Sequence, residues 1–455
     1  MIENLSICSF QLVITLAMEG IIMTLQLILS LSILIILHEF GHFITARMFG
    51  IKVEKFYLFF DAWGIKLFKL KKGDTEYGIG WLPLGGYVKI SGMIDESMDK
   101  EQLKEPAKPW EFRSKPAWQR LIVMLAGVTV NLILGVVIFS MNIAVFEKQY
   151  LPMDEINKTG IYVNTSGEKI GFKNGDKIIA VNNKKVERYN DATSIGILFG
   201  AKITIERNGE IIDITVPDTI YKDFKRTHQH LYSFDNFLTV VDSIIPNSNA
   251  ANSLLKVGDA ISMIDSVPTP NFTTLVRQLH QHKGDSVKLS VLRKGYEIAI
   301  NVKIDSLGKI GFSRQLPDIQ LKEYSISQAI KYGTSDALET MVVNAKGLGN
   351  VFKGEDNVSE SVQGPIAIAS MFGPVWDWER FWRLTGMLSM VLAFMNVLPI
   401  PALDGGHAAL TIYEMIARRK PSDKFMEYAQ AAGMLLLLSL MVFIFGNDIY
   451  RQFFM

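Results

Sequence analysis

One short stretch of the chain has the residue types and spacing to bind a metal ion. His38, Glu39 and His42 occur together in the sequence HEFGH. In a helix, residues four positions apart share one face, so both imidazoles could reach a single zinc ion. Zinc held by neutral imidazoles keeps a position open for water, and Glu39 could take a proton from that water and pass it to a leaving amine. The stretch indicates metal-assisted hydrolysis of a peptide bond.

Two histidines leave zinc one protein ligand short, and Asp404 is the candidate for the third. It lies in NVLPIPALDGGH, 396–407, where two prolines break a helix and a Gly-Gly pair allows a tight turn. Two alternatives remain open from the residues alone. Asp404 could cap a helix that resumes at His407, or His407 could itself be the ligand.

The elements that carry these residues are apolar. The hydrophobic fraction is 49% and the mean hydropathy is +0.20, both high for a soluble enzyme. Ionisable groups inside a membrane span are costly and indicate function. The net charge of +1 does not point to a nucleic-acid partner, and the single cysteine, Cys8, excludes both an intrachain disulfide and a cysteine-based zinc site.

Four segments are long enough to cross a bilayer, each near the ~20 residues that a helix needs. The third is interrupted by NVLPIPALDGG, and such broken backbone is tolerated in a membrane where it lines a buried or wet cavity. We predict spans at 21–48, 117–146, 378–418 and 428–446.

Basic residues predict the orientation of these spans. Lysines and arginines are frequent in 49–116, and Arg418, Arg419 and Lys420 lie in the turn between the last two spans. Because basic loops stay in the cytoplasm, we expect both loops there and the large middle region outside.

The middle region contains an internal repeat. GFKNGDKIIAVNNKKV and LLKVGDAISMIDSVPT are each followed by a strand–turn–strand pattern, and the pattern resembles PDZ domains at 155–218 and 238–305. A PDZ domain binds an extended peptide at a sheet edge, although the two copies could also be packing modules without an open groove. An amphipathic linker, 325–375, follows.

The paired motifs HEFGH and N-x-x-P-x-P-x-L-D-G-G resemble the site-2 protease family of intramembrane zinc metalloproteases. YGIGWLPLGGYVKISGM, PAWQRLIVMLAGVTVNLILG, SVQGPIAIA and the two PDZ copies resemble its RseP-like subgroup, named after the regulator of sigma-E protease. YLFFDAWG and DTEYGIGWLPLGGY look like the Bacteroidetes branch. The resemblance extends from about residue 23 to 450.

The resemblance implies particular site residues. Zinc would be held by His38, His42 and Asp404, with Glu39 as general base. Asn131, in a G-x-x-x-N motif of the second span, matches a position near the active site. Its amide could polarise a scissile carbonyl, or it could form an interhelical hydrogen bond.

Further residues would bind substrate by the same resemblance. Asn396 matches an asparagine that engages the substrate backbone. Gly85 and Gly86 form the corner of an apolar hairpin that resembles a membrane-associated β-loop within 49–116, and an extended substrate could pair with its edge.

We therefore expect a polytopic α-helical membrane protein with four spans, a membrane-associated β-loop and two extracytoplasmic PDZ domains. The expected activity is zinc-dependent cleavage of single-span membrane proteins of the anti-sigma-factor type, after an upstream site-1-type protease, and of remnant signal peptides. The expected location is a bacterial inner membrane, in contact with lipid, with the active site toward the cytoplasm and the PDZ domains in the periplasm.

The alternatives are a catalytically silent PDZ scaffold or chaperone and another membrane zinc protease, such as a prenyl-protein peptidase. The intact ligand set disfavours the scaffold, and the L-D-G-G motif with the PDZ pair disfavours the peptidase. Residues 1–20 are treated as an uncertain extension, either signal-like or upstream of a true start at Met18 or Met23.

Overall fold

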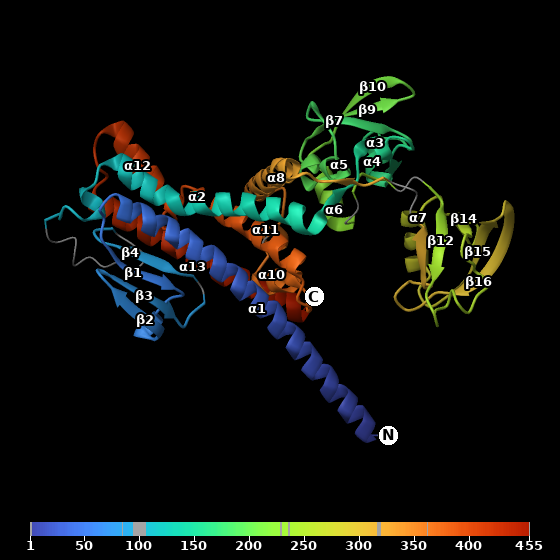
Figure 1. Cartoon of the computed structure of the whole chain (residues 1–455), viewed down its shortest axis with the longest axis horizontal. Helices are drawn as coiled ribbons and strands as arrows, with labels where there is room; N and C mark the ends of the chain where they lie inside the picture. The colour runs from blue at the N-terminus through green and yellow to red at the C-terminus, as the bar shows by residue number, and fades with distance from the viewer. Residues whose placement is uncertain are drawn as a thin grey trace. The chain divides into compact units, whose positions relative to one another are not determined.

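The computed structural model describes residues 2–83, 85–93, 106–227, 230–234, 237–315, 320–361 and 363–454. The chain forms two compact units, and each is described by itself (Figure 1). The first unit combines residues 1–148 with 324–455, and the second consists of residues 149–323.

Long helices dominate the first unit. The helices are α1 (Ile2–Met48), α2 (Ala117–Asn142, continued by the π-helical turn Ile143–Glu147), α8 (Ile326–Phe352), α9 (Val358–Ser361), α10 (Pro365–Phe372), α11 (Trp378–Val397), α12 (Asp404–Ala417) and α13 (Asp423–Phe454). The described part of the segment between α1 and α2 contains the short 3₁₀ turns Ala62–Gly64 and Phe112–Ser114.

Three of these helices are long and apolar enough to cross a membrane: 18–48 in α1, 117–147 in α2 and its extension, and 424–451 in α13. The predicted third span is divided into α11 and α12 by six residues, 398–403, that are not helical. Neither α11 nor α12 alone meets the combined length and hydropathy required of a complete span. The structure therefore gives three candidate spans, and the fourth remains a prediction.

Helix α2 contacts α1, α8, α11 and α12, and small residues bring the backbones close. A Cβ at Gly41 of α1 would lie 2.7 Å from the carbonyl oxygen of Ala126 in α2. Gly333 of α8 is packed equally closely against Ser140. Close backbone approach through small residues is typical of helix packing in membranes.

Helix α13 is joined to α10 by a buried carboxylate. The N-cap residue of α10 is Gly364, which has no side chain to accept the first N–H groups. Asp448 of α13 supplies the acceptor, at 2.7 Å from the amide nitrogen of Ile366 and 3.3 Å from that of Ala367. The negative charge also suits the positive end of the helix dipole.

A four-stranded sheet follows α1 and lies beside its C-terminal half (Figure 1). Its strands are β1 (Val53–Leu58), β2 (Lys66–Lys72), β3 (Thr75–Gly80) and β4 (Tyr87–Ile90), in the order β2-β3-β1-β4. Strands β1 and β3 are parallel, and the other pairs are antiparallel. Within the described residues, β4 is an edge strand.

The two faces of this sheet differ in polarity, as the period-two alternation of strands requires. The apolar face carries Phe56, Leu58, Phe68, Leu70, Tyr77 and Ile79, which the register places together. It packs against α1 through Phe43, whose ring centroid is 5.5 Å from that of Phe56. Phe68 and Leu70, farther along the face, are each 55% exposed, so this face stays apolar beyond its contact with the helix.

The second unit contains two PDZ-like regions with separate hydrophobic cores. The first consists of α3 (Met153–Ile156), β6 (Tyr162–Val163), α4 (Thr165–Lys169), β7 (Lys177–Val181), β8 (Lys184–Lys185), α5 (Tyr189–Thr193), the 3₁₀ turn Ile195–Leu198, β9 (Lys202–Arg207), β10 (Glu210–Thr215), α6 (Ile220–Thr227) and β11 (Tyr232–Ser233). Its sheets have the orders β10-β9-β7-β8 and β11-β6.

The second region repeats this arrangement with longer strands. It consists of β12 (Thr239–Ile244), β13 (Ala260–Ile264), β14 (Val267–Pro268), α7 (Phe272–Gln281), β15 (Ser286–Arg293), β16 (Tyr296–Lys303) and β17 (Phe312–Gln315). The strand order is β16-β15-β13-β12-β17, with β14 beside β13. The returning strands β11 and β17 lie beyond the predicted ranges 155–218 and 238–305, because two to four residues are too short to show an alternating pattern.

The ends of the second unit meet. Strands β5 (Gln149–Tyr150) and β18 (Lys322–Glu323) pair antiparallel, so the chain enters and leaves the unit at one place.

Candidate metal centre and active site

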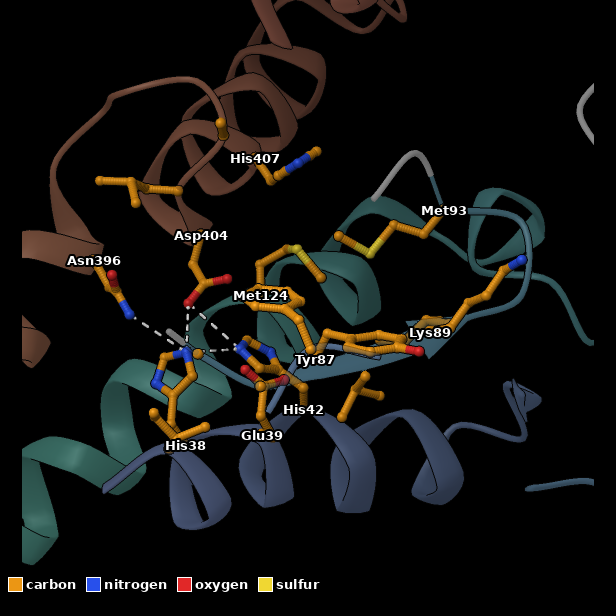
Figure 2. A pocket seen from close by; sticks show the side chains of 18 of the residues that line it. His38, Glu39, His42, Tyr87, Lys89, Met93, Met124, Asn396, Asp404 and His407 are labelled. Carbon is orange, nitrogen blue, oxygen red and sulfur yellow. Dashed lines mark hydrogen bonds and ion pairs between the residues drawn. The ribbon is translucent and has the colours of Figure 1, made fainter. Parts of the chain in front are cut away.

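Three side chains from two helices bring one potential ligand atom each to a common point. His38 and His42 lie on α1, and Asp404 is the first residue of α12 (Figure 2). Oδ2 of Asp404 is 3.1 Å from Nε2 of His38 and 3.3 Å from Nε2 of His42, and the two Nε2 atoms are 3.3 Å apart. Among the described residues these three form the only group of this kind that could hold a metal ion.

The spacing of these atoms fits zinc. Bonds of about 2.0–2.2 Å in a tetrahedral site place neighbouring ligand atoms about 3.3 Å apart. The mutual distances of 3.1, 3.3 and 3.3 Å agree with three corners of such a tetrahedron, which leaves the fourth corner for water or substrate. Oδ2 of Asp404 is buried and has no hydrogen-bond partner among the described residues, and a bound cation would satisfy it.

The hydrogen bond made by Nδ1 of His42 determines the tautomer of this ring, and therefore which nitrogen can bind a metal ion. Nδ1 of His42 lies 2.7 Å from the backbone carbonyl oxygen of Val123 in α2. Because a carbonyl oxygen only accepts hydrogen bonds, Nδ1 carries the proton and Nε2 presents its lone pair. Such an outer hydrogen bond is usual for a metal-binding histidine.

The geometry decides between the alternatives for Asp404. The residue that caps α12 is Leu403, and the helix begins at Asp404 rather than at His407. The carboxylate is directed at the two histidines, so the capping interpretation is wrong. His407 lies on the same helix after Asp404, outside the three-residue group, and Figure 2 shows its ring away from His38 and His42.

The metal-binding atoms open onto a cavity of about 600 Å³. This volume lies within the range of ordinary ligand sites. All eight residues singled out in the sequence line it: His38, Glu39, His42, Gly85, Gly86, Asn131, Asn396 and Asp404. Figure 2 shows the Glu39 carboxylate beside the two imidazole rings. The structure thus brings the whole predicted set together, from α1, α2, the segment before β4, and the two sides of the helix break.

Two asparagines contact His38 from different helices. Nδ2 of Asn131 is 3.2 Å from Nδ1 of His38, and Nδ2 of Asn396 is 3.3 Å from Nε2 of the same ring. Asn131 is fully buried, whereas Asn396 is partly exposed to the cavity. The two amides therefore approach opposite sides of one imidazole.

Gly85 and Gly86 precede β4, whose residues 87–90 also line the cavity. A Cβ at Gly86 would come 2.7 Å from the backbone oxygen of Tyr57 and from Cγ2 of Ile35. A glycine is required there for the chain to pass between α1 and β1.

The cavity wall includes a polar cluster that the sequence motifs did not indicate. Tyr87 donates a hydrogen bond to Asp61 at 2.8 Å, and Nζ of Lys55 is 3.3 Å from the same carboxylate. Burial alone would raise the pKa of Asp61, but the hydrogen bond from Tyr87 and the charge of Lys55 lower it. In the adjacent pair, the hydrogen bond from Lys66 lowers the pKa of Glu76 to about 2. The alternation of residues along β1 and β4 could have placed Lys55 and Tyr87 on one face, but not the groups that lie outside these two strands.

Comparison with known proteins supplies the family. Residues 26–440 match the model described as peptidase family M50. The chain is 26% identical to the regulator of sigma-E protease RseP of Escherichia coli, over 93% of this chain and 97% of the relative. It is 27% identical to the metalloprotease MmpA of Caulobacter vibrioides, over 95% and 96%.

A candidate zinc metalloprotease of Neisseria meningitidis is 26% identical over 94% of this chain and 98% of its own length. These similarities extend over the helices, the cavity and the PDZ-like regions alike. With the tetrahedral fit of the His–His–Asp group, they show that this chain is a membrane zinc metalloprotease and belongs to peptidase family M50, the site-2 protease family.

Proposed function

We propose that this protein hydrolyses peptide bonds within or next to the transmembrane segments of single-span membrane proteins. The observation that carries the proposal is the position of Glu39, which shares one cavity with the three metal-binding atoms. That cavity is lined by α1 and α2, two of the helices long and apolar enough to cross a membrane. The supported reaction is therefore hydrolysis at membrane depth.

The residues of the chain have separate roles in the proposed reaction. Bound zinc would polarise the scissile carbonyl and make water a better nucleophile at neutral pH. The Glu39 carboxylate accepts a proton from the attacking water and then delivers it to the leaving amide nitrogen. The Asn396 amide, directed at the metal-binding side of His38, can donate a hydrogen bond to the substrate backbone.

The edge strand β4 is the proposed binding surface for the substrate backbone. A helical peptide bond is shielded by its own hydrogen bonds, so the substrate must unwind before water can attack. Strand β4 is paired with β1 on one side, and its residues line the cavity. An unwound substrate segment can add by main-chain hydrogen bonds to the side of β4 that pairs with no other strand among the described residues.

The orientation and the substrates are proposals of the same kind. Basic residues in 49–116 and at Arg418, Arg419 and Lys420 favour a cytoplasmic location for both loops, with the second unit outside and α11–α12 as a fourth, interrupted span. The name of the Escherichia coli relative links it to regulation of sigma-E. An anti-sigma-factor-like protein, already trimmed by an outer protease, is the proposed substrate, with remnant signal peptides as a second class.

The test uses a tagged single-span substrate co-expressed with either the wild-type protein or Glu39→Gln. The glutamine keeps the size of the side chain but does not accept a proton, so we expect zinc to remain bound and cleavage to fall by at least about 100-fold. Zinc content of the purified proteins is measured in parallel, with His38→Ala as the control that loses metal.

The outcomes separate the possible readings. Cleavage inside the span by the wild type alone supports the proposal. Equal cleavage by Glu39→Gln shows that Glu39 is not the base. Zinc binding without any cleavage, for both full-length and trimmed substrates, favours a PDZ-bearing scaffold.

A further inference from the structure

Asn131 is the one fully buried polar side chain that contacts a metal-binding histidine from α2. Its amide nitrogen lies 3.2 Å from Nδ1 of His38, on the side of the ring away from Asp404. Its amide oxygen, Oδ1, is buried and has no hydrogen-bond partner within the described residues. An unpaired buried acceptor next to a histidine needs an explanation.

Metal binding determines what His38 needs at this position. A neutral imidazole that binds zinc through Nε2 carries its proton on Nδ1, so Nδ1–H becomes a hydrogen-bond donor. The neighbouring group must then be an acceptor. Rotation of the Asn131 amide by half a turn exchanges two atoms of nearly equal size and presents Oδ1 to Nδ1–H. The same rotation pairs Oδ1 and turns the amide N–H groups toward the place that Oδ1 leaves.

After this rotation, Nδ1 of each metal-binding histidine donates to an oxygen of α2. Nδ1 of His42 already donates to the carbonyl oxygen of Val123 at 2.7 Å. Val123 and Asn131 both lie on α2, two helical turns apart, so one helix supplies an acceptor to each imidazole. Outer acceptors of this type orient the ring and raise the basicity of the metal-binding nitrogen.

We propose that Asn131 is a positioning residue, whose amide oxygen accepts a hydrogen bond from Nδ1–H of His38 and holds Nε2 ready for zinc. The inference rests on the assignment of His38 as a zinc ligand. It differs from a role in polarising the scissile carbonyl, which needs the amide N–H, and from a purely interhelical contact, which needs neither tautomer of His38.

Two substitutions at this position separate the three roles. Asn131→Asp keeps an acceptor of the same shape and removes the donor, whereas Asn131→Leu removes both at similar volume. Zinc affinity is measured by competition with a chelating dye on the purified full-length protein. We expect Asn131→Leu to bind zinc about 10- to 100-fold more weakly and Asn131→Asp to bind it at least as tightly as the wild type.

Ser389→Ala is the matched control for helix packing. Oγ of Ser389 donates to the backbone oxygen of Asn131 at 2.7 Å and is also fully buried, but it does not contact either histidine in the structure. We expect this variant to retain its zinc affinity. Thermal unfolding of each variant in detergent identifies any that lose zinc because the helices separate.

The result is decisive in either direction. Wild-type zinc affinity in Asn131→Leu, or equal weakening in the Asp and Leu variants, overturns the positioning role. Unchanged zinc affinity with slower cleavage in Asn131→Asp would assign the N–H to the substrate carbonyl instead. Retention of zinc by His38→Ala would show that the underlying metal assignment, rather than the role of Asn131, is wrong.

Discussion

At the scale of single residues, the metal centre depends on an absent side chain as much as on those present. Gly127 of α2 faces the two imidazoles, and a Cβ at this position would overlap Nε2 of His42 and Cε1 of His38. The glycine therefore allows α2 to pass directly behind the metal-binding face of α1. The G-x-x-x-N motif thus has two structural uses: space for the rings at Gly127 and a hydrogen bond at Asn131.

We expect Gly127→Ala to displace both imidazoles and to weaken zinc binding and cleavage together. A displacement of about 1 Å at a reacting centre can cost about 100-fold in rate. Zinc content and cleavage of the single-span substrate measure the effect. Gly446→Ala is the control, because a Cβ at that helical glycine would meet no described atom within 4 Å beyond the nearby backbone of its own helix. Wild-type zinc content in Gly127→Ala would contradict this explanation of the motif.

The sequence indicated which residues line one cavity better than it indicated their contacts. The spacing of His38 and His42 on one helix face is a local property, so it could be inferred without a structure. The partner of Nδ1 in each ring could not, since Val123 and Asn131 approach from another helix. The direction of the Asp404 carboxylate was equally hidden, because residues near a helix start are compatible with either capping or metal binding.

At the scale of elements, each of the two PDZ-like regions contains its own arginine–aspartate ion pair, with the same arrangement in both. Arg293 at the end of β15 donates to both oxygens of Asp259 at 2.6 and 2.7 Å, and to the backbone oxygen of Leu254 at 2.8 Å. Arg207 of β9 repeats these contacts with Asp176 and Gly171. Both aspartates lie in the repeated stretches of the sequence, but the arginines lie 31 and 34 residues later and carry no local signal.

Burial alone would raise the pKa of Asp259, but hydrogen bonds from Arg293 and from the backbone of Lys256 lower it. The ion pair therefore stabilises the folded state at pH values above about 4, the ordinary pKa of aspartate. This contribution to stability is lost as the pH falls through the lower pKa that Asp259 has in the folded state. Burial is the largest of these effects, so we expect the sign to reverse in Arg293→Met, where the Lys256 hydrogen bond remains but the guanidinium does not.

We expect Arg293→Met to accelerate hydrogen exchange in β13 and β15 at pH 7, and a change to pH 5 to reverse part of this effect. Mass spectrometry of the intact protein, corrected for intrinsic exchange rates, measures it. Lys288→Met, which changes an exposed lysine on the same strand, should leave the rates unchanged. Faster exchange of Arg293→Met at pH 5 than at pH 7 would refute the reversed sign.

The sequence also predicted the elements to different degrees. Long apolar helices and regular hairpins have strong periodic patterns, and α2, α11 and α12 each lie in an apolar segment of the sequence. Strand β4 has only four residues and follows a Gly-Gly corner, so its place at the edge of a sheet depends on tertiary pairing with β1. The packing of α8 against α2 likewise depends on small residues whose partners are remote in sequence.

At the scale of the whole molecule, the second unit is inserted at one point. Strands β5 and β18 pair, and the backbone N–H of Tyr324 donates to the carbonyl oxygen of Lys148 at 2.9 Å. Residues 149–323 can therefore be replaced by a short Gly-Ser turn without separating the ends of the first unit. We propose that the PDZ-like regions exclude untrimmed substrates, and this replacement tests the proposal directly.

We expect the protein without residues 149–323 to cleave a substrate that retains its full outer domain, which the wild type should cleave only after trimming. A gel assay of both substrates against both proteins measures the selectivity. The same deletion combined with Glu39→Gln controls for other proteases. Unchanged selectivity after the deletion would remove size exclusion from the function of the second unit.

The edge position of β4 has an energetic consequence for the proposed reaction. Each backbone polar group left without a partner in hydrocarbon costs several kcal/mol, which normally keeps a membrane helix wound. Strand β4 offers a ladder of donors and acceptors at the cavity, so a segment that leaves its helix exchanges one set of hydrogen bonds for another. Strand β4 would thus lower the barrier to unwinding before any peptide bond is hydrolysed. The number of residues in the strand would limit how much of the substrate is unwound at once.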